Sequence, residues 1–187
     1  DPPPLTSFNL VKFTSEEAAR VPLFEASYPE ANIPVLSQAA EGAGYFNIFP
    51  DPDGTVRWAP LVIKYQDRFY CSLSLAVLQK YMEGSPLALR IAEFGVEQMR
   101  LGKLSIPTNE EGMVLINYRG PQKTFPHYSA TDVIHGRVPP KAFQGKIVLV
   151  GATAIGIYDL RNTPYSPVYP GVEIHATVID NMLQNRF

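Results

Sequence analysis

Polar residues that could bind a charged ligand lie in the last third of the chain. Arg119 directly follows a predicted strand, and Asp159 and Arg161 lie in a predicted loop between a strand and a helix. An arginine in such a position can hold a carboxylate or a phosphate through two parallel hydrogen bonds. Asp159 and Arg161 could equally pair with each other and fix the loop, so both interpretations stay open.

A glycine-containing loop, residues 151–156, follows an apolar run at the place where a phosphate-binding loop would lie. The dinucleotide fingerprint requires glycine where Thr153 stands, and the P-loop requires lysine where Ile157 stands, so neither nucleotide motif is present. Crevices at the carboxyl ends of strands are nevertheless where α/β sheets bind ligands. Gly151 and Thr153 are therefore candidate ligand contacts, with a glycine-permitted turn as the alternative.

The histidines and the single cysteine form no recognisable metal-binding or catalytic pattern. His127, His135 and His175 have no close spacing to one another or to Cys71, and neither His-Glu-x-x-His nor Cys-x-x-Cys occurs. We expect His175 to be hydrogen-bonded at the edge of the core, and we keep it as a candidate ligand contact. Cys71 heads an apolar helical pattern, which favours buried packing. No catalytic residue, metal or cofactor is predicted.

The composition predicts one folded domain and excludes some classes of partner. The 187 residues are 45% hydrophobic and 18% charged, as in ordinary globular proteins. Lys and Arg number 16 against 18 Asp and Glu, and no basic run could neutralise a row of phosphates, so nucleic acid is not expected as a partner. No Gly-x-Ser-x-Gly elbow occurs, and the chain is not expected to be an enzyme.

Hydrophobic periodicity predicts an α/β fold, namely a mixed sheet with helices packed on it, a small antiparallel meander and a three-layer-like core. The meander is predicted from strands within 45–49 and 56–65, joined by a tight turn at Asp53-Gly54, and from Phe69-Tyr70 after a further turn at Gln66-Asp67. This turn explains Asp51 and Asp53 better than calcium binding does, because the later ligands of an EF-hand are missing.

The tail predicts a strand, a loop and a helix in succession. Residues 146–151 form a continuous apolar run ending in glycine, which is typical of a strand buried on both faces. The loop covers 152–170, and the amphipathic helix 171–185 carries Val172 and Ile179 on one stripe. Other predicted helices are 34–43, 72–82 and 129–135, the last capped by the Ser129 hydroxyl, and other predicted strands are 9–13, 89–94, 103–106 and 114–118.

Neither a membrane-spanning segment nor a signal peptide is predicted within the chain. The sequence opens with Asp1-Pro2-Pro3-Pro4 and stops just after a helical pattern without a recognised C-cap. We expect both ends to be boundaries cut within a longer protein.

Seven short motifs follow one another between Phe46 and Ala176, within a resemblance that runs from about residue 32 to the end of the chain. They are Phe46 to Arg57, Ala59-Pro60-Leu61, Tyr70 to Ser74, Ile106-Pro107-Thr108, Ile116 to Pro121, Lys146 to Thr153 and Pro170 to Ala176. In this order they resemble the second CHASE family of sensory domains. The resemblance is specific because of the order of the motifs, since each motif alone is weak evidence for the family.

The resemblance implies the extracytoplasmic, signal-sensing domain of a bacterial transmembrane receptor, on the periplasmic or extracellular side of the inner membrane. It implies membrane helices on both sides of the domain, one starting soon after Phe187, and an intracellular cyclase or kinase as the output. The signal would be an unknown small molecule or a periplasmic protein. We expect it to act by shifting the helix at 171–185.

Family members usually begin with a strand, helix, strand portion that has no counterpart in this sequence. We therefore interpret residues 1–187 as one sensor domain, in which 1–31 is a linker and N-terminal remnant and 32–187 is the family-like region. If strands that normally lie beside 147–150 are absent, a sheet edge is left open. Either those strands have been cut away, or another copy of the chain supplies a strand that covers the edge.

An alternative function is a periplasmic protein-interaction or dimerisation module, which could form a homodimer and would need no small-molecule ligand. Exposed aromatic residues around 125–128 or 165–169 could form its surface. A periplasmic hydrolase, the third hypothesis, has no positive support in the sequence.

Overall fold

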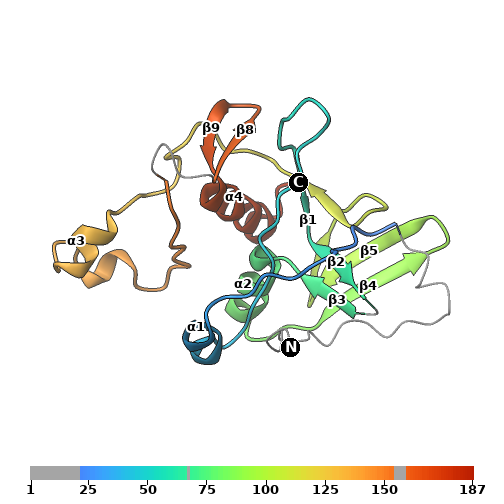
Figure 1. The fold of residues 1–187 in the computed structure, drawn as a ribbon, viewed down its shortest axis with the longest axis horizontal. Coiled ribbons are helices and arrows are strands. Elements are labelled where there is room, and N and C mark those ends of the chain that lie inside the picture. The colour runs from blue at the N-terminus through green and yellow to red at the C-terminus, as the bar shows by residue number, and fades with distance from the viewer. Residues whose placement is uncertain (1–21, 67, 154–158) are drawn as a thin grey trace.

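The computed structural model describes residues 22–66, 68–153 and 159–187, and it confirms the α/β class (Figure 1). Within these ranges there are four α-helices and nine strands. The helices are α1 (Pro34–Ala39), α2 (Leu73–Tyr81), α3 (Ala130–Ile134) and α4 (Gly171–Gln184). The strands are β1 (Trp58–Pro60), β2 (Val62–Tyr65), β3 (Arg68–Cys71), β4 (Leu87–Ala92), β5 (Gly95–Leu101), β6 (Leu104–Ile106), β7 (Met113–Leu115), β8 (Leu160–Thr163) and β9 (Ser166–Pro170).

The strands are grouped into four small antiparallel sheets, ordered β1-β7, β2-β3, β4-β5-β6 and β8-β9. Parallel pairing among the described residues is limited to isolated bridges, Glu25 to Lys64, Tyr45 to Ser72 and Thr55 to Asn162. The β2-β3 hairpin confirms the part of the predicted meander that joins 56–65 to Phe69-Tyr70. None of the helices in the described ranges is both long and apolar enough to span a bilayer.

Helices α2 and α4 pack against each other and form the centre of the core (Figure 1). Ser72 caps α2, where its hydroxyl accepts a hydrogen bond from the Leu75 backbone N–H. This cap satisfies one of the free N–H groups of the first turn. The apolar residues Leu75 and Leu78 of α2 and Ile174 and Met182 of α4 are all buried, which confirms the helices predicted at 72–82 and 171–185. Cys71 is buried as predicted, and burial raises the pKa of its thiol to about 12.

The three-stranded sheet differs from its prediction by one strand. The predicted strands at 89–94 and 103–106 correspond to β4 and β6, but β5 between them was missed. Met99 and Leu101 of β5 point into the core while Arg100 is exposed, so the period-two pattern is present from Gln98 onward. Gly95 and a register shift at Arg90 and Ile91 interrupt the pattern at the other end.

The hairpin predicted between 45–49 and 56–65 is wrong, although its turn is real. The Gly54 N–H donates to the Asp51 carbonyl at 2.8 Å, and the Asp51 N–H donates to the Thr55 carbonyl at 2.9 Å. Beyond this turn the two segments separate. Pro50 and Pro52 have no N–H to donate to a ladder, and β1 pairs with β7 instead of with 45–49. Tyr45 bridges to Ser72.

The buried strand predicted at 146–151 is also wrong. The segment forms neither helix nor strand, and no strand pairs with it in the described part of the chain. Ile147 and Leu149 are half-buried, whereas Val150 is 92% exposed and Val148 is exposed as well. An apolar run becomes a buried strand only where neighbours cover it, and none of the described elements does so here.

The predicted 152–170 loop contains the β8-β9 hairpin. Pro164, Pro167 and Pro170 concealed it, because proline argues against strand in a sequence pattern. Within the predicted aromatic surface at 165–169, Tyr165 is exposed but Tyr169 is fully buried. The strand predicted at 9–13 lies outside the described residues.

Three helix ends also differ from their predictions. Helix α1 ends at Ala39 because Ala40 is already extended. The Ser129 hydroxyl makes no capping bond to α3, and its backbone carbonyl accepts from Asp132 instead. Asn185 adopts the left-handed conformation with φ of 50°, so it is the C-cap of α4 that the sequence pattern failed to reveal.

Two glycines give a matched test of backbone packing. Gly95 has φ of 132°, and a Cβ there would collide with the Glu110 backbone carbonyl; Gly54 has φ of 80° with open space around it. We expect Gly95→Ala to lower the free energy of unfolding by about 2–4 kcal/mol and Gly54→Ala by about 1 kcal/mol. Denaturant unfolding of both variants measures the difference. Equal effects would show that the contact with Glu110 is unimportant.

Candidate functional site

Helix α4 uses one face to hold the backbone and side chains of residues 117–124. Glu173, Asp180 and Asn181 on this face each bind a different part of that segment. Their spacing, seven residues and then one, keeps them on one side of an α-helix. Glu173 and Asn181 are buried, so their polar atoms must be paired to avoid a large desolvation cost.

Asn181 makes two hydrogen bonds to a single backbone residue, Asn117. The Asn117 N–H donates to Asn181 Oδ1, and Asn181 Nδ2 donates to the Asn117 carbonyl, both at 2.9 Å. A carboxamide offers a donor and an acceptor side by side, which matches the N–H and C=O of one extended residue. Asn181 therefore joins α4 to the segment that follows β7 as a neighbouring strand would.

Glu173, in the first turn of α4, receives two backbone hydrogen bonds. The Lys123 N–H donates to Oε2 and the Thr124 N–H donates to Oε1, each at 3.0 Å. His127 Nε2 lies 3.8 Å from the same carboxylate. Hydrogen bonds to a charged acceptor are stronger than neutral ones, so Glu173 fixes the turn at 123–124 firmly against the helix.

The third contact, between Arg119 and Asp180, lies nearer the surface. Arg119 Nη1 is 3.2 Å from Asp180 Oδ1, and the guanidinium also lies 5.7 Å from the centre of the Phe125 ring. The ion pair is partly exposed and contributes little to stability. Arg119, which the sequence predicts as a residue that could bind an anion, is therefore already paired with Asp180.

The first turn of α4 gathers several of the other predicted residues. The Gly171 N–H donates to the Asp159 carbonyl at 2.9 Å, and a Cβ on Gly171 would collide with the Asp159 carboxylate. Gly151 packs equally closely, since a Cβ there would lie 2.6 Å from Val172 Cβ. Because neither glycine has a side chain, the backbone at Gly151 can contact Val172 of α4, and Asp159 can contact α4 at Gly171.

His175 connects the same turn to helix α2. Its Nδ1 lies 3.0 Å from the Ser74 hydroxyl. Burial lowers the pKa of His175, and this outweighs a hydrogen bond to the Phe46 backbone and the charge of Asp159, which both act in the opposite direction. The ring is therefore kept neutral near neutral pH.

Of the six candidate ligand contacts, the structure brings four together. Gly151, Asp159 and His175 surround the first turn of α4, and Arg161 Nη2 lies 3.5 Å from Asp159 Oδ1. Arg119 lies about two turns further along the helix, at Asp180. Thr153 is exposed. Their role in ligand binding stays a prediction.

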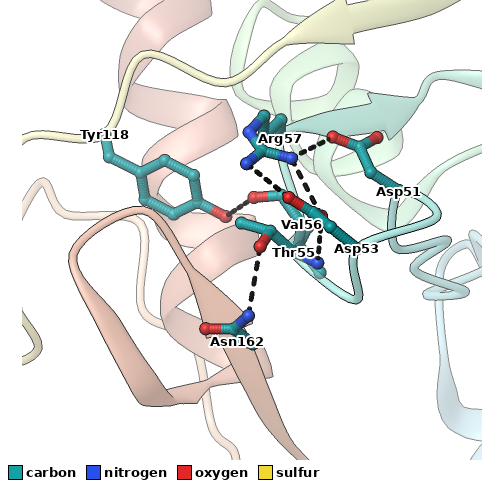
Figure 2. A network of polar contacts seen from close by, with 7 residues as sticks. All are labelled: Asp51, Asp53, Thr55, Val56, Arg57, Tyr118 and Asn162. Atoms are coloured by element: carbon teal, nitrogen blue, oxygen red, sulfur yellow. Dashed lines mark hydrogen bonds and ion pairs between the residues drawn. The ribbon is translucent and has the colours of Figure 1, made fainter.

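A polar cluster fixes the 51–57 turn beside this helix (Figure 2). Arg57 binds Asp51 at 2.7 Å and Asp53 at 2.8 Å, and its guanidinium holds the pKa of Asp53 well below the usual range. Tyr118 donates from its hydroxyl to the Val56 carbonyl at 2.9 Å. The Asn162 side chain donates to the Thr55 hydroxyl at 3.1 Å. Asp51 and Asp53 thus bind an arginine, consistent with a turn rather than a calcium site.

A cavity of about 370 Å³ opens at the C-terminal end of α4. It is lined mainly by apolar and aromatic side chains from the end of β7, the β8-β9 turn and the last residue of the chain. The lining residues are Leu115, Ile116, Asn117, Tyr118, Pro164, Tyr165 and Phe187. Asn117, which Asn181 holds, is also part of this wall.

Sequence reasoning missed Glu173 and Asn181, the two residues that organise the site. A signal was present, because Glu173, Thr177 and Asn181 recur every four residues beside the apolar stripe of α4. A regular line of polar residues on a buried face predicts internal hydrogen bonds. In the described ranges no group of three His, Cys, Asp or Glu could hold a metal ion.

Nearly the whole chain matches the family model of an extracellular sensory domain. The matched family is the CHASE2 domain, over residues 7–187, and the chain belongs to this family. The match begins further toward the N-terminus than the resemblance expected from the sequence, which starts at about residue 32. No curated protein and no solved structure matches the chain.

The lowered pKa of His175 predicts a pH-dependent stability. Because the unfolded chain binds this proton more tightly, the free energy of unfolding should fall as the pH drops below about 6.5 and level off below the folded-state pKa. In His175→Gln this part of the fall should disappear. Chemical denaturation between pH 7.5 and about 5 checks it, with His135→Gln as an exposed control. An unchanged slope in His175→Gln would contradict the prediction.

Asn181 offers a test of the paired hydrogen bonds. Asn181→Asp keeps the acceptor but replaces the donor with a charged oxygen beside the Asn117 carbonyl, so we expect a loss of about 2 kcal/mol of unfolding free energy. Gln184→Ala, at an exposed position of the same helix, should change it by less than about 0.5 kcal/mol. Thermal or denaturant unfolding gives both values. A tolerated Asn181→Asp would mean that the carboxamide does not anchor the segment.

Proposed function

We propose that this domain senses a signal outside the inner membrane for a bacterial transmembrane receptor whose intracellular output is a nucleotide cyclase or a protein kinase. The signal is a small molecule or a periplasmic protein. Membership in an extracellular sensory family supports the first half of this proposal. The arrangement around α4 supports the mechanism.

The observation that carries the mechanism is that α4 is bound to residues 117–124 by buried side chains along its whole length. Glu173 holds Lys123 and Thr124 near the start of the helix, and Asn181 holds Asn117 near its end. A displacement of the segment therefore displaces the helix. A signal needs only to bind one position of α4 better than another, by about 1–3 kcal/mol, to change the output.

The place where the signal would act is the first turn of α4. Asp159, Arg161 and His175 supply charge and hydrogen-bonding capacity there, and Gly151 and Thr153 lie on the adjoining loop. Arg119 lies further along the helix and would join only if its pairing with Asp180 opened. A ligand at this turn would change the packing between α4 and α2, since His175 is bound to Ser74.

The coding sequence on both sides of this segment provides the first test. Apolar stretches of about 20 residues on each side, followed by a cyclase or kinase, are expected for the receptor. A stop codon directly after Phe187, or a continuation without membrane helices, would contradict the proposed function.

Within the parent receptor, α4 should control the output. We expect Glu173→Gln, which removes the charge that binds two backbone N–H groups, to change the basal cyclase or kinase activity of receptor-containing membranes about fivefold or more. The control Gln184→Ala should leave the activity unchanged at equal receptor amounts. If Glu173→Gln and the equally buried Asn181→Asp both leave the activity unaltered in folded receptor, α4 is not the transmitter.

A further inference from the structure

Residues 121–151, which we name the arm, extend from the body of the domain (Figure 1). The arm contains α3 and a short 3-10 helix, Pro140–Ala142, and neither has a buried residue. Its internal packing is limited to contacts such as the edge-to-face pair of Tyr128 and Phe143, with ring centres 5.3 Å apart. The arm therefore has no core of its own.

The arm leaves large apolar side chains in contact with water. Ile134 is 81% exposed and Val150 is 92% exposed, and Tyr128, Val133 and Val148 are exposed as well. Single exposed apolar residues are ordinary, but a run of them on one projecting segment is typical of an interaction surface. The arm is thus suited to covering, or being covered by, another surface.

A second exposed apolar surface lies on the body, in residues 22–41, which we name the α1 face. Helix α1 has no buried residue. Ile33, Val35 and Leu36 on and beside it are each more than half exposed, and Tyr28 is 86% exposed. Leu23 of this segment is buried and Phe24 stacks on Phe49, but the described residues of the same chain leave Tyr28 and residues 33–36 uncovered.

The arm and the α1 face carry opposite charge. The arm has four basic residues against one aspartate, a formal charge of +3, and the α1 face has three glutamates and no Lys or Arg. Two ion pairs within the same chain involve these charged residues: Arg137 with Asp132, and Glu41 with Lys80. In the described residues this leaves Lys123, Lys141 and Lys146 on the arm, and Glu25 and Glu30 on the face, without an ion-pair partner.

The backbone of the arm favours a protein over a lipid surface as its partner. Residues 147–150 form neither helix nor strand, and no hydrogen bond joins their backbone to another described residue. Lipid cannot satisfy backbone N–H and C=O groups, whereas an added strand can. On the body, the 24–26 segment bonds to Lys64 through Phe24 and Ala26 only, so its Glu25 edge is open among the described residues.

We propose that the arm of one copy covers the α1 face of a second copy, and that the exchange is reciprocal in a two-fold symmetric dimer. Each copy carries both surfaces, so the two contacts are equivalent and the assembly is closed. The exposed valines and Ile134 contact the apolar residues of α1, and the arm lysines face Glu25 and Glu30. This dimer does not depend on the proposed receptor function.

A charge-exchange experiment on the full chain tests the dimer. Sedimentation velocity over a concentration series should show a monomer–dimer equilibrium. One variant reverses the charge of the arm (Lys141→Glu with Lys146→Glu), and another reverses the charge of the α1 face (Glu25→Lys with Glu30→Lys). Each should raise the dimer dissociation constant about tenfold or more. An equimolar mixture of the two reversed proteins should regain the original affinity, because both contacts of the mixed dimer join opposite charges.

Controls keep the result unambiguous. Arg100→Glu with Lys103→Glu reverses two exposed charges on the β4-β5-β6 sheet and should leave the dissociation constant unchanged, and circular dichroism should be the same for all variants. The proposal is overturned if the original chain is monomeric at every concentration, if the reversed proteins associate as before, or if their mixture does not. Binding of a monomer to phosphatidylglycerol vesicles, lost on arm reversal, would assign the arm to a membrane surface and likewise overturn it.

Discussion

The need to pair buried polar groups on one face of α4 determines the arrangement of the rest of the domain. Glu173 and Asn181 are almost inaccessible to water, and a polar atom without a partner there would cost on the order of 1–3 kcal/mol. Their partners are backbone groups of Asn117, Lys123 and Thr124 rather than side chains. The path of the chain after β7, and hence the point where the arm leaves the body, follows from this constraint.

A second set of polar contacts extends this arrangement to the opposite side of Tyr118. The Tyr118 hydroxyl binds the Val56 carbonyl, and Asn162 of β8 binds Thr55. The turn at 51–57 is in turn fixed by Arg57 between two aspartates (Figure 2). Segments far apart in the sequence are therefore joined by polar side chains that bind either a backbone carbonyl or another side chain. A change of position at one of them reaches α4 without any large rearrangement of the apolar core.

The elements that could be predicted from sequence are those decided by local pattern. Helices α2 and α4 have clear apolar stripes, and the turn at Gly54 has its characteristic residues. Elements decided by distant partners could not be predicted: segment 146–150 has the composition of a buried strand but no pairing strand among the described residues, and the β8-β9 hairpin forms despite its prolines. The same reason applies to the site. Asp159 is a candidate because it lies in the loop between a predicted strand and a predicted helix, and His175 because it lies on the apolar face of that helix, whereas the role of Asn181 depends on a residue 64 positions away.

The left-handed conformation of Asn185 determines which movements of α4 could be transmitted to a segment that follows it. A continuous helix carries torsion along its axis, so that rotation at one end appears as rotation at the other. Asn185 ends the helical hydrogen bonding of α4, and its own N–H bonds back to Met182 while that of Arg186 bonds to Asn181. Any element that continues beyond Phe187 is therefore joined to α4 through a bend. It would respond to the direction and distance by which the end of α4 is pulled, and very little to its twist.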